Sequence, residues 1–202
     1  MGGAHKQALQ RRSREKLARV LGVTRNLLIA EGLQAVSTTA VAARAGISVG
    51  WLYTYFENRD ALLEEILIGC LRGLDEAMDD AGLNLGGPNW RRNALAGSQA
   101  CVDYFDRDAA FRGLWFSDEF NGHMLKVNRL HDDAMAAWLA GTVTEVREDA
   151  PPVPMDVVTQ VYVGMLDKGV DLAYRDNPNK ANEQVRDEVV RASVEYLAAF
   201  LP

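Results

Sequence analysis

Four aromatic side chains fall within the ten residues Ile47–Phe56, ISVGWLYTYF, although the whole chain is only 8% aromatic. On a helix with about 3.6 residues per turn, Leu52 and Phe56 share one face, while Trp51 and Tyr55 lie on the opposite face. Large exposed rings are costly in water unless a partner covers them, and the major groove of duplex DNA admits such a helix. We therefore interpret the first pair as core residues and the second pair as candidate DNA contacts. The alternative is that all of these rings pack against a neighbouring helix.

The neighbours of these rings carry groups suited to phosphate binding and close approach. Ser37, Ser48 and Asn58 are typical helix N-caps, and the free amides that follow each of them can donate to phosphate oxygens. Gly50 has no side chain, so the backbone of its helix can approach DNA closely. Tyr53, at the flank of the same helix, fits DNA contact and core packing equally well.

The sequence offers little for catalysis or metal binding. His123 and His131 are eight residues apart, and no HxxxH or CxxC spacing occurs. Neither a G-x-S-x-G motif nor a glycine-rich phosphate loop is present. We predict no enzymatic activity, no catalytic residue, no metal site and no cofactor.

The elements that must position these groups are helical. Apolar residues recur at three- and four-residue spacing along most of the 202 residues, and no segment shows a convincing strand pattern. The spacing predicts an all-α fold of about nine helices. They are expected at about 17–31, 38–45, 49–56, from 59 past 71, 90–107, 109–120, 122–147, 156–175 and 181–200, with a flexible break at 81–89 and a proline-rich loop at 150–156.

Two short helices joined at Gly46 and flanked by longer ones form a helix-turn-helix unit. Val41, Ala42 and Ala45 give the first short helix an inner face of small residues. Small residues let the two helices approach closely, so the second helix can project from the surface.

Charge is divided unevenly along the chain. The net charge is −6, but residues 1–60 hold nine basic and four acidic residues, a net charge of +5, and the remainder holds 13 basic and 24 acidic residues, a net charge of −11. A basic end on an acidic body is expected when one end meets a polyanion. A solvated arm explains residues 6–19 equally well, so DNA contact by the arm stays open. We divide the chain into residues 1–58, an N-terminal arm with a helix-turn-helix DNA-binding domain, and residues 59–202, a ligand-binding and dimerisation domain.

Cysteine content and hydropathy indicate the cellular compartment in which the protein is expected. Cys70 and Cys101 lie in apolar helical patterns and, without a secretory signal, are expected to be buried reduced thiols. No apolar run is long enough to span a membrane. We expect a cytoplasmic protein with no membrane partner.

The run from Gly32 to Leu63 resembles the N-terminal domain of the TetR family of bacterial repressors. The matching features are the glycine, a Ser/Thr cap, Val-Ala, Ala-Gly-Ile-Ser, Gly-x-Leu-Tyr-x-Tyr-Phe and Asn-Arg-Asp-x-Leu. The resemblance covers about residues 14–63, and the later helices fit the family only in number and arrangement. It implies a three-helix DNA-binding domain followed by a helical ligand-binding and dimerisation domain.

The resemblance also implies roles for single residues. Thr38, Thr39, Tyr53 and Arg59 occupy positions at which the family contacts phosphate. Tyr55 occupies the Tyr/His position that follows the contacting aromatic residue. The base-reading positions are occupied by Val49, Gly50 and Trp51. With the three caps, the predicted DNA-binding residues are Ser37, Thr38, Thr39, Ser48, Val49, Gly50, Trp51, Tyr53, Tyr55, Asn58 and Arg59.

This sequence departs from the family pattern at two of the reading positions. Val49 replaces what is often lysine or another polar residue, and Trp51 replaces what is usually a small one. Base readout is therefore expected to depend on methyl contacts, backbone fit and DNA shape.

Aromatic residues and methionines are concentrated in the middle helices. Each one alone is better explained by core packing, but the group exceeds what helix packing needs and suits a mainly apolar cavity for a small organic effector. We expect a flat aromatic or lipophilic effector, with a cationic compound as one form of it. The predicted ligand-binding residues are Trp90, Tyr104, Phe105, Phe111, Trp115, Phe116, Phe120, Met124, His131, Met135, Trp138, Tyr162 and Met165.

A single short reading helix covers too few base pairs to find one genomic site, so a symmetric dimer on a pseudo-palindromic operator is expected. The last two helices carry apolar stripes, and the resemblance implies that they pair with their mates; intramolecular packing would use part of the same stripes. We predict a homodimeric repressor that binds double-stranded operator DNA and is released by a small effector. The alternative is a helical small-molecule-binding dimer without operator-specific DNA binding.

Overall fold

The computed structural model describes residues 2–117, 120 and 122–202, with side chains from residue 10 onward. Within these residues the chain forms nine α-helices, one 3-10 turn and no strand, which confirms the predicted all-α class. The elements are α1 (Gly2–Glu31), η1 (Leu33–Ala35), α2 (Thr38–Ala45), α3 (Val49–Leu52), α4 (Arg59–Asp80), α5 (Trp90–Arg107), α6 (Ala109–Trp115), α7 (Gly122–Thr142), α8 (Met155–Tyr174) and α9 (Glu183–Leu197).

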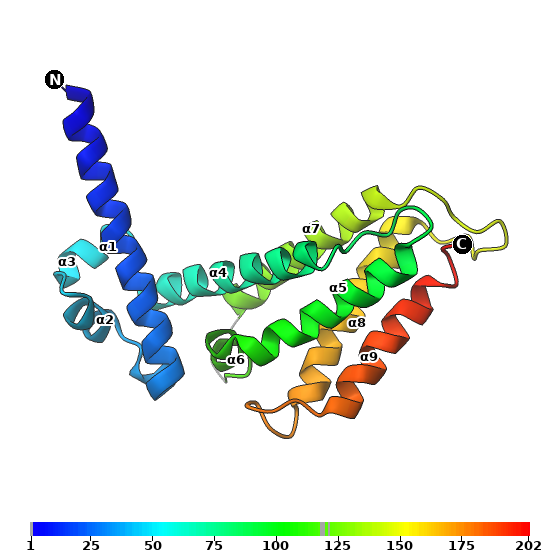
Figure 1. Ribbon diagram of the computed structural model, residues 1–202. Helices are drawn as coiled ribbons and strands as arrows, with labels where there is room; N and C mark the ends of the chain where they lie inside the picture. The colour runs from blue at the N-terminus through cyan, green and yellow to red at the C-terminus, as the bar shows by residue number, and fades with distance from the viewer. Residues whose placement is uncertain (1, 118–119, 121) are drawn as a thin grey trace.

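The molecule has a small head and a larger helical body (Figure 1). The head holds α1 to α3, and α4 runs from it along the body, where α5, α7, α8 and α9 lie. Helix α4 contacts α1 and α6 as well as α5 and α7, so it belongs to both parts. The N-terminal turns of α1 project away from the head, and the C-terminus lies at the far end of the body (Figure 1).

The predicted caps begin the helices of the head. The side chains of Ser37, Ser48 and Asn58 each accept a hydrogen bond from the backbone amide three residues on, at 3.1, 3.1 and 2.9 Å. Gly46, with φ at 65°, ends α2 in the left-handed conformation that glycine adopts without strain. The turn between α2 and α3 is therefore determined by local chemistry.

The predicted inner faces are confirmed. The small residues Val41, Ala42 and Ala45 are buried, as are Leu52 and Phe56. Both cysteines are buried and free, as expected.

Several expected boundaries are wrong. Helix α3 ends at Leu52 rather than at residue 56, because the chain turns through residues 53–55 toward the Asn58 cap. Helix α6 ends at Trp115 rather than at residue 120, and α7 ends at Thr142 rather than at residue 147. Residues 118 and 119 of the range expected for α6 lie outside the described residues.

The segment expected to be a flexible break is an ordered part of the structure, and so is the basic arm, for which DNA contact and a solvated tail were both open. In the break at 81–89, Leu83 and Leu85 are only 3% and 2% exposed, so the connection packs onto the core instead of being flexible. The basic arm at 6–19 continues α1 as regular helix. None of the described helices is long and apolar enough to cross a membrane.

Candidate functional site

The outward face of the head is formed by two tyrosines and a tryptophan. Tyr53 is 51% exposed and Tyr55 is 46% exposed, whereas Leu52 beneath them is fully buried. Trp51 is half-buried: its ring packs against the ring of Tyr55, with centroids 4.6 Å apart and the planes tilted by 38°, and the Lys16 ammonium lies 5.6 Å from the Trp51 ring centre. The rings therefore form an ordered surface at the end of α3, with one edge held by α1.

The other predicted DNA contacts surround this surface. The hydroxyls of Thr38 and Tyr53 lie 3.3 Å apart, so the start of α2 lies next to the end of α3. Thr39 is exposed, and Val49 is half-buried. Gly50 is exposed, and a Cβ built on it would meet nothing within 4 Å. The capping residues Ser37, Ser48 and Asn58 are exposed beside these groups.

Arg59 has a structural role in the fold. Its Nε donates to the carbonyl of Val36 and its Nη2 donates to the carbonyl of Leu33, both at 2.6 Å. These hydrogen bonds tie η1 to the start of α4 and so fix the segment that leads into α2. A phosphate contact by Arg59 stays a prediction.

A buried ion pair joins the head to the body. The Arg25 guanidinium on α1 donates to both oxygens of Asp108, at 2.8 and 2.7 Å. Asp108 also caps α6 by accepting from the Phe111 amide at 3.0 Å, and it accepts from the Tyr104 hydroxyl at 3.1 Å. The thiol of Cys70 on α4 accepts from Arg25 at 3.1 Å, so α1, α4, α5 and α6 meet at this cluster.

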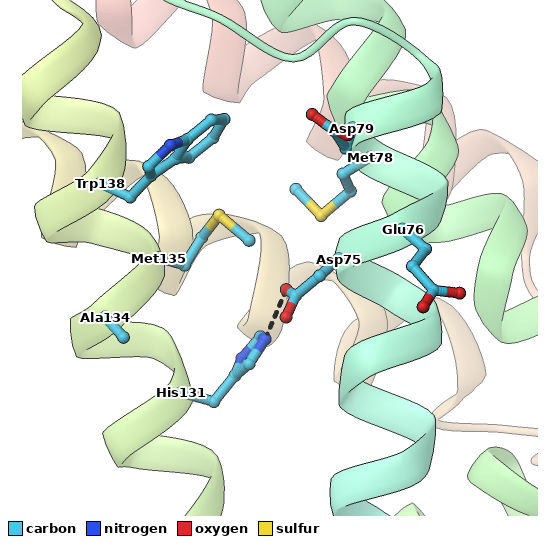
Figure 2. Close-up of a pocket in the computed structure, with 8 residues that line it drawn as sticks. All are labelled: Asp75, Glu76, Met78, Asp79, His131, Ala134, Met135 and Trp138. Atoms are coloured by element: carbon cyan, nitrogen blue, oxygen red, sulfur yellow. Dashed lines mark hydrogen bonds and ion pairs between the residues drawn. The ribbon is translucent and has the colours of Figure 1, made fainter.

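The body contains an open pocket of about 430 Å³ between α4 and α7. Figure 2 shows Met135 and Trp138 of α7 facing Met78 of α4 across the gap, while the Glu76 side chain points away from it. The lining residues are Asp75, Glu76, Met78, Asp79, His131, Ala134, Met135 and Trp138. Trp138 is 45% exposed, which is unusual for a large ring unless a ligand or partner covers it.

An inner chamber continues this pocket into the bundle. The two share Met78, His131 and Met135 as lining residues, and the inner space is only about 40 Å³. Three rings form its wall at the α6 end. Phe105 stacks on Phe111 at 4.3 Å, and Trp115 meets both edge-on at 5.4 and 5.5 Å.

Acidic groups dominate the electrostatics of both chambers. His131 Nε2 lies 2.7 Å from Asp75 Oδ1, and its Nδ1 lies 3.5 Å from Asp132 Oδ1. Burial acts to lower the pKa of His131, but the hydrogen bonds and charges of these two carboxylates outweigh it and raise the pKa to about 9. Burial and the nearby Asp132 charge raise the pKa of Asp167 to about 6. In the described part of the chain, no lysine or arginine lines either chamber.

The structure brings together six of the thirteen predicted ligand-binding residues: Phe105, Phe111, Trp115, His131, Met135 and Trp138. The other seven lie elsewhere in the bundle. Trp90 donates its indole N–H to the Pro202 carbonyl at 2.5 Å, and Tyr162 is fully buried with its hydroxyl 2.7 Å from that of Ser98. The remaining five, which line neither chamber, are Tyr104, Phe116, Phe120, Met124 and Met165.

Sequence reasoning missed the α4 side of the pocket. Asp75, Met78 and Asp79 line it, but the apolar period of α4 indicates only core packing. The acidic residues between those apolar positions were the only available signal, and they equally fit a solvated face. Among the described residues, no group of three or more His, Cys, Asp or Glu side chains is placed to hold a metal ion.

A helix-turn-helix head with exposed rings, joined to a helical body with an internal pocket, defines a DNA-binding regulator of the two-domain helical class. Residues 20–66 match the family described as bacterial regulatory proteins of the tetR family, and residues 98–197 match the tetracyclin repressor-like C-terminal domain.

Named relatives and solved structures agree with these matches. The HTH-type transcriptional repressor KstR of Rhodococcus jostii is 30% identical over 163 residues, which is 76% of this chain and 72% of that protein. The protein of the same name from Mycolicibacterium smegmatis is 37% identical over 84 residues, which is 42% of this chain but only 41% of that protein's length. The crystal structure of a TetR-family regulator from Streptomyces coelicolor matches with a TM-score of 0.63 at 24% identity, covering 92% of this chain and 97% of that one. A transcriptional regulator from Rhodococcus sp. matches with a TM-score of 0.64 at 14% identity, covering 91% of this chain and 96% of that one.

The chain therefore belongs to the TetR family of bacterial regulatory proteins. It is a ligand-responsive DNA-binding transcriptional regulator and not an enzyme.

His131 is expected to make stability depend on pH. Its folded pKa of about 9 lies above its ordinary value of 6.5, so its contribution is complete below pH 6.5 and is lost as pH rises through about 9. His131→Gln is expected to remove up to about 2–3 kcal/mol of this pH-dependent unfolding free energy, measured by urea unfolding across that window. His123→Gln on the same helix is the control, because His123 is 61% exposed. An unchanged pH dependence in His131→Gln would contradict the assignment.

Proposed function

We propose that this protein is a homodimeric repressor, which binds pseudo-palindromic operator DNA through α2 and α3 and is released by a small organic effector. Both named relatives are repressors, which supports repression rather than activation. The division of the chain near residue 58 into a DNA-binding and an effector-binding part is included in the proposal. Helix α4 begins at Arg59, immediately after this boundary, and continues into the body.

Operator binding is supported by the exposed aromatic surface of the head. Tyr53 and Tyr55 project from the end of a capped helix, with the hydroxyls of Thr38 and Thr39 and the backbone at Gly50 beside them. These groups suit phosphate contact, methyl contact and close backbone approach. A protein that reads DNA with few hydrogen-bonding side chains depends on the shape of its operator.

The effector site is supported by two adjacent chambers beside α4 and α7 that share three lining residues. The outer one offers the rings and thioethers of Trp138, Met78 and Met135 to an apolar ligand. Asp79 supplies negative charge at its α4 wall, whereas the Asp75 carboxylate is paired with His131, and the lining has no lysine or arginine among the described residues. A lipophilic ligand that is positively charged fits this pocket better than an anionic one of the same shape.

The route from effector to DNA runs through α6. Phe111 and Trp115 of α6 form the wall of the inner chamber, and Asp108 at the start of α6 holds Arg25 of α1. An effector that moves these rings therefore also displaces the cap to which α1 is bound. Release requires that the effector prefer the dimer state with the lower DNA affinity.

Dimerisation is supported by an apolar face on α8 and α9. Val157, Val161 and Leu172 are 40%, 42% and 38% exposed, and half-buried Val185 and Val189 lie along a shallow groove beside Leu172. The rest of the predicted stripes packs within the chain, as shown by buried Val158, Val194, Leu197 and Phe200. The exposed remainder is available to a second copy.

The DNA-reading surface is tested with the double variant Tyr53→Phe, Tyr55→Ala. Its affinity for a duplex selected by the wild-type protein from a random library is expected to fall by about ten-fold or more, since a hydrogen bond to a charged group such as a phosphate is worth about 1.5–3 kcal/mol. Fluorescence anisotropy measures the affinity, and thermal unfolding should change little because both rings are exposed. Leu95→Ala, an exposed site on α5, is the control. Sequence-blind binding by the wild type would instead support the alternative of a ligand-binding dimer without operator recognition.

The charge preference of the pocket is tested with tetraphenylphosphonium and tetraphenylborate, which have nearly the same shape and opposite charge. The cation is expected to quench tryptophan fluorescence and to release bound DNA, and the anion is not. Asp79→Asn is expected to weaken binding of the cation several-fold, because it removes a partly solvated charge from the pocket. Asp80→Asn is the matched control, since Asp80 is the next residue on α4 and does not line this pocket. Equal binding of both ions would overturn the charge preference while leaving operator binding intact.

The dimer face is tested with Val161→Glu. The variant is expected to become monomeric by size exclusion with light scattering and to lose operator affinity, because a charge on each copy would be buried without a partner. Leu130→Glu, at a 60% exposed site on α7, is the control and should remain dimeric. A dimeric Val161→Glu protein with normal DNA binding would exclude this face as the interface.

A further inference from the structure

The N-terminal part of α1 is a basic helix that lies before the region matching the family. The family match begins at residue 20, whereas α1 begins at Gly2. Residues 10–19 hold five basic side chains and one acidic side chain, Glu15. The basic residues are Arg11, Arg12, Arg14, Lys16 and Arg19, and all five are exposed.

This helix has little reason of its own to be ordered. Between residue 10 and Leu17 no side chain is fully buried, and Val20 is the first buried residue. The first turn of α1 holds no acidic residue and the last turn holds no basic one, so its charges are not arranged to stabilise the helix dipole. Most of the surface of this helix is polar and exposed, so a partner that covers it would stabilise it.

The basic helix is held against the DNA-reading surface. The Ser13 hydroxyl hydrogen-bonds the Tyr55 hydroxyl, and the Lys16 ammonium lies 5.6 Å from the Trp51 ring centre. One turn further on, Arg19 Nη1 donates to the Ala45 carbonyl of α2 at 3.4 Å. Three side chains of α1, spaced three residues apart over nearly two turns, therefore contact α2 and the end of α3. The N-terminal turns of α1 project beyond α3, away from the body (Figure 1).

We propose that the N-terminal turns of α1 form a second DNA contact, in which Arg11, Arg12 and Arg14 bind phosphates of the duplex just outside the bases read by α3. The inference rests on the proposed operator binding. DNA that approaches the exposed rings of α3 also meets this helix, because Ser13 and Lys16 fix its position beside Tyr55 and Trp51. Arginine suits the contact because its guanidinium binds phosphate oxygens in a bidentate manner and keeps its charge.

The partner is identified by charge and by continuity with the reading surface. The body is acidic, with a net charge of −11 after residue 60, so the positive field of the protein is confined to the head. A basic helix continuous with a groove-reading surface meets the phosphates of the same duplex. Because phosphate contacts carry no sequence information, this helix adds affinity and orientation, while specificity stays with α2 and α3.

The test is the salt dependence of binding by the full-length triple variant Arg11→Gln, Arg12→Gln, Arg14→Gln. Anisotropy titrations use the selected duplex with long flanks at a series of salt concentrations. Each phosphate contact that is lost lowers the slope of log K against log salt by about 0.9. With three contacts per protomer, the slope is expected to fall by at least about 2.7, and affinity at low salt by more than ten-fold.

Two further variants separate charge from structure. The charge-preserving Arg11→Lys, Arg12→Lys, Arg14→Lys protein is expected to keep most of the wild-type slope. The matched control Arg92→Gln, Arg129→Gln, Arg175→Gln removes three exposed basic residues from the body and should leave the slope unchanged. On a duplex cut back to the bases read by α3, the wild type and the first triple variant should bind alike.

The outcomes distinguish this inference from the proposed function. The wild type and the glutamine triple variant could both bind the selected duplex specifically and show the same slope of log K against log salt. This result would overturn the second contact and leave operator binding standing. An equal loss of slope in the body control would also overturn it, since the effect would then come from net charge. A wild type with no specific binding would overturn both.

Discussion

The buried carboxylate of Asp108 is the interaction on which the arrangement of the two parts depends. Only 9% of Asp108 is exposed, so its charge must be compensated from within the protein. Burial acts to raise the pKa of Asp108, but the hydrogen bonds from Arg25 and from the Phe111 amide outweigh it and hold the pKa below its usual value. The same hydrogen bonds join α1 to α6, and Tyr104 adds α5. Displacing α1 relative to α6 would leave the buried Asp108 charge without its guanidinium partner, whereas displacing α5 would cost only the hydrogen bond from Tyr104. Helices α1 and α6 are therefore expected to move together.

Because of this ion pair, the position of the pocket relates it to the DNA-binding head. The inner chamber lies against α6, and its wall of three aromatic rings includes Phe111, whose own amide donates a hydrogen bond to Asp108. The pocket, the ion pair and the head thus form one chain of direct contacts, from ring to cap to guanidinium. Charge follows the same division, with basic residues around the DNA-reading surface and carboxylates around the pocket. Each part of the molecule is suited to a partner of opposite charge.

Local chemistry was predictable from the sequence, and contacts between distant residues were not. The caps at Ser37, Ser48 and Asn58 and the left-handed Gly46 are determined by neighbours within four residues, so the helix-turn-helix unit followed directly from the sequence. Helical period also separated buried Leu52 from exposed Tyr55, but it did not reveal that Tyr55 and Lys16 would half-cover Trp51. Arg25 and Asp108 are 83 residues apart, and nothing in either local pattern pairs them. The α4 wall of the pocket was missed for a related reason, because alternating apolar and acidic residues on a helix describe a surface equally well. Whether such a face meets solvent or a cavity depends on where α7 packs.

The size of the inner chamber determines how an effector can act. A space of about 40 Å³ holds about one water molecule, so an organic ligand cannot extend from the outer pocket into the bundle unless the rings of Phe111 and Trp115 move. Because α6 is short and its cap is bound to Arg25, rotation of these rings is coupled to the position of α1. An effector that fills only the outer pocket needs no such movement, so coupling to the head would require a ligand that reaches the rings of α6. Linkage then requires the coupling to be mutual: an effector that lowers operator affinity by a given factor must itself bind more weakly, by the same factor, to the protein on DNA.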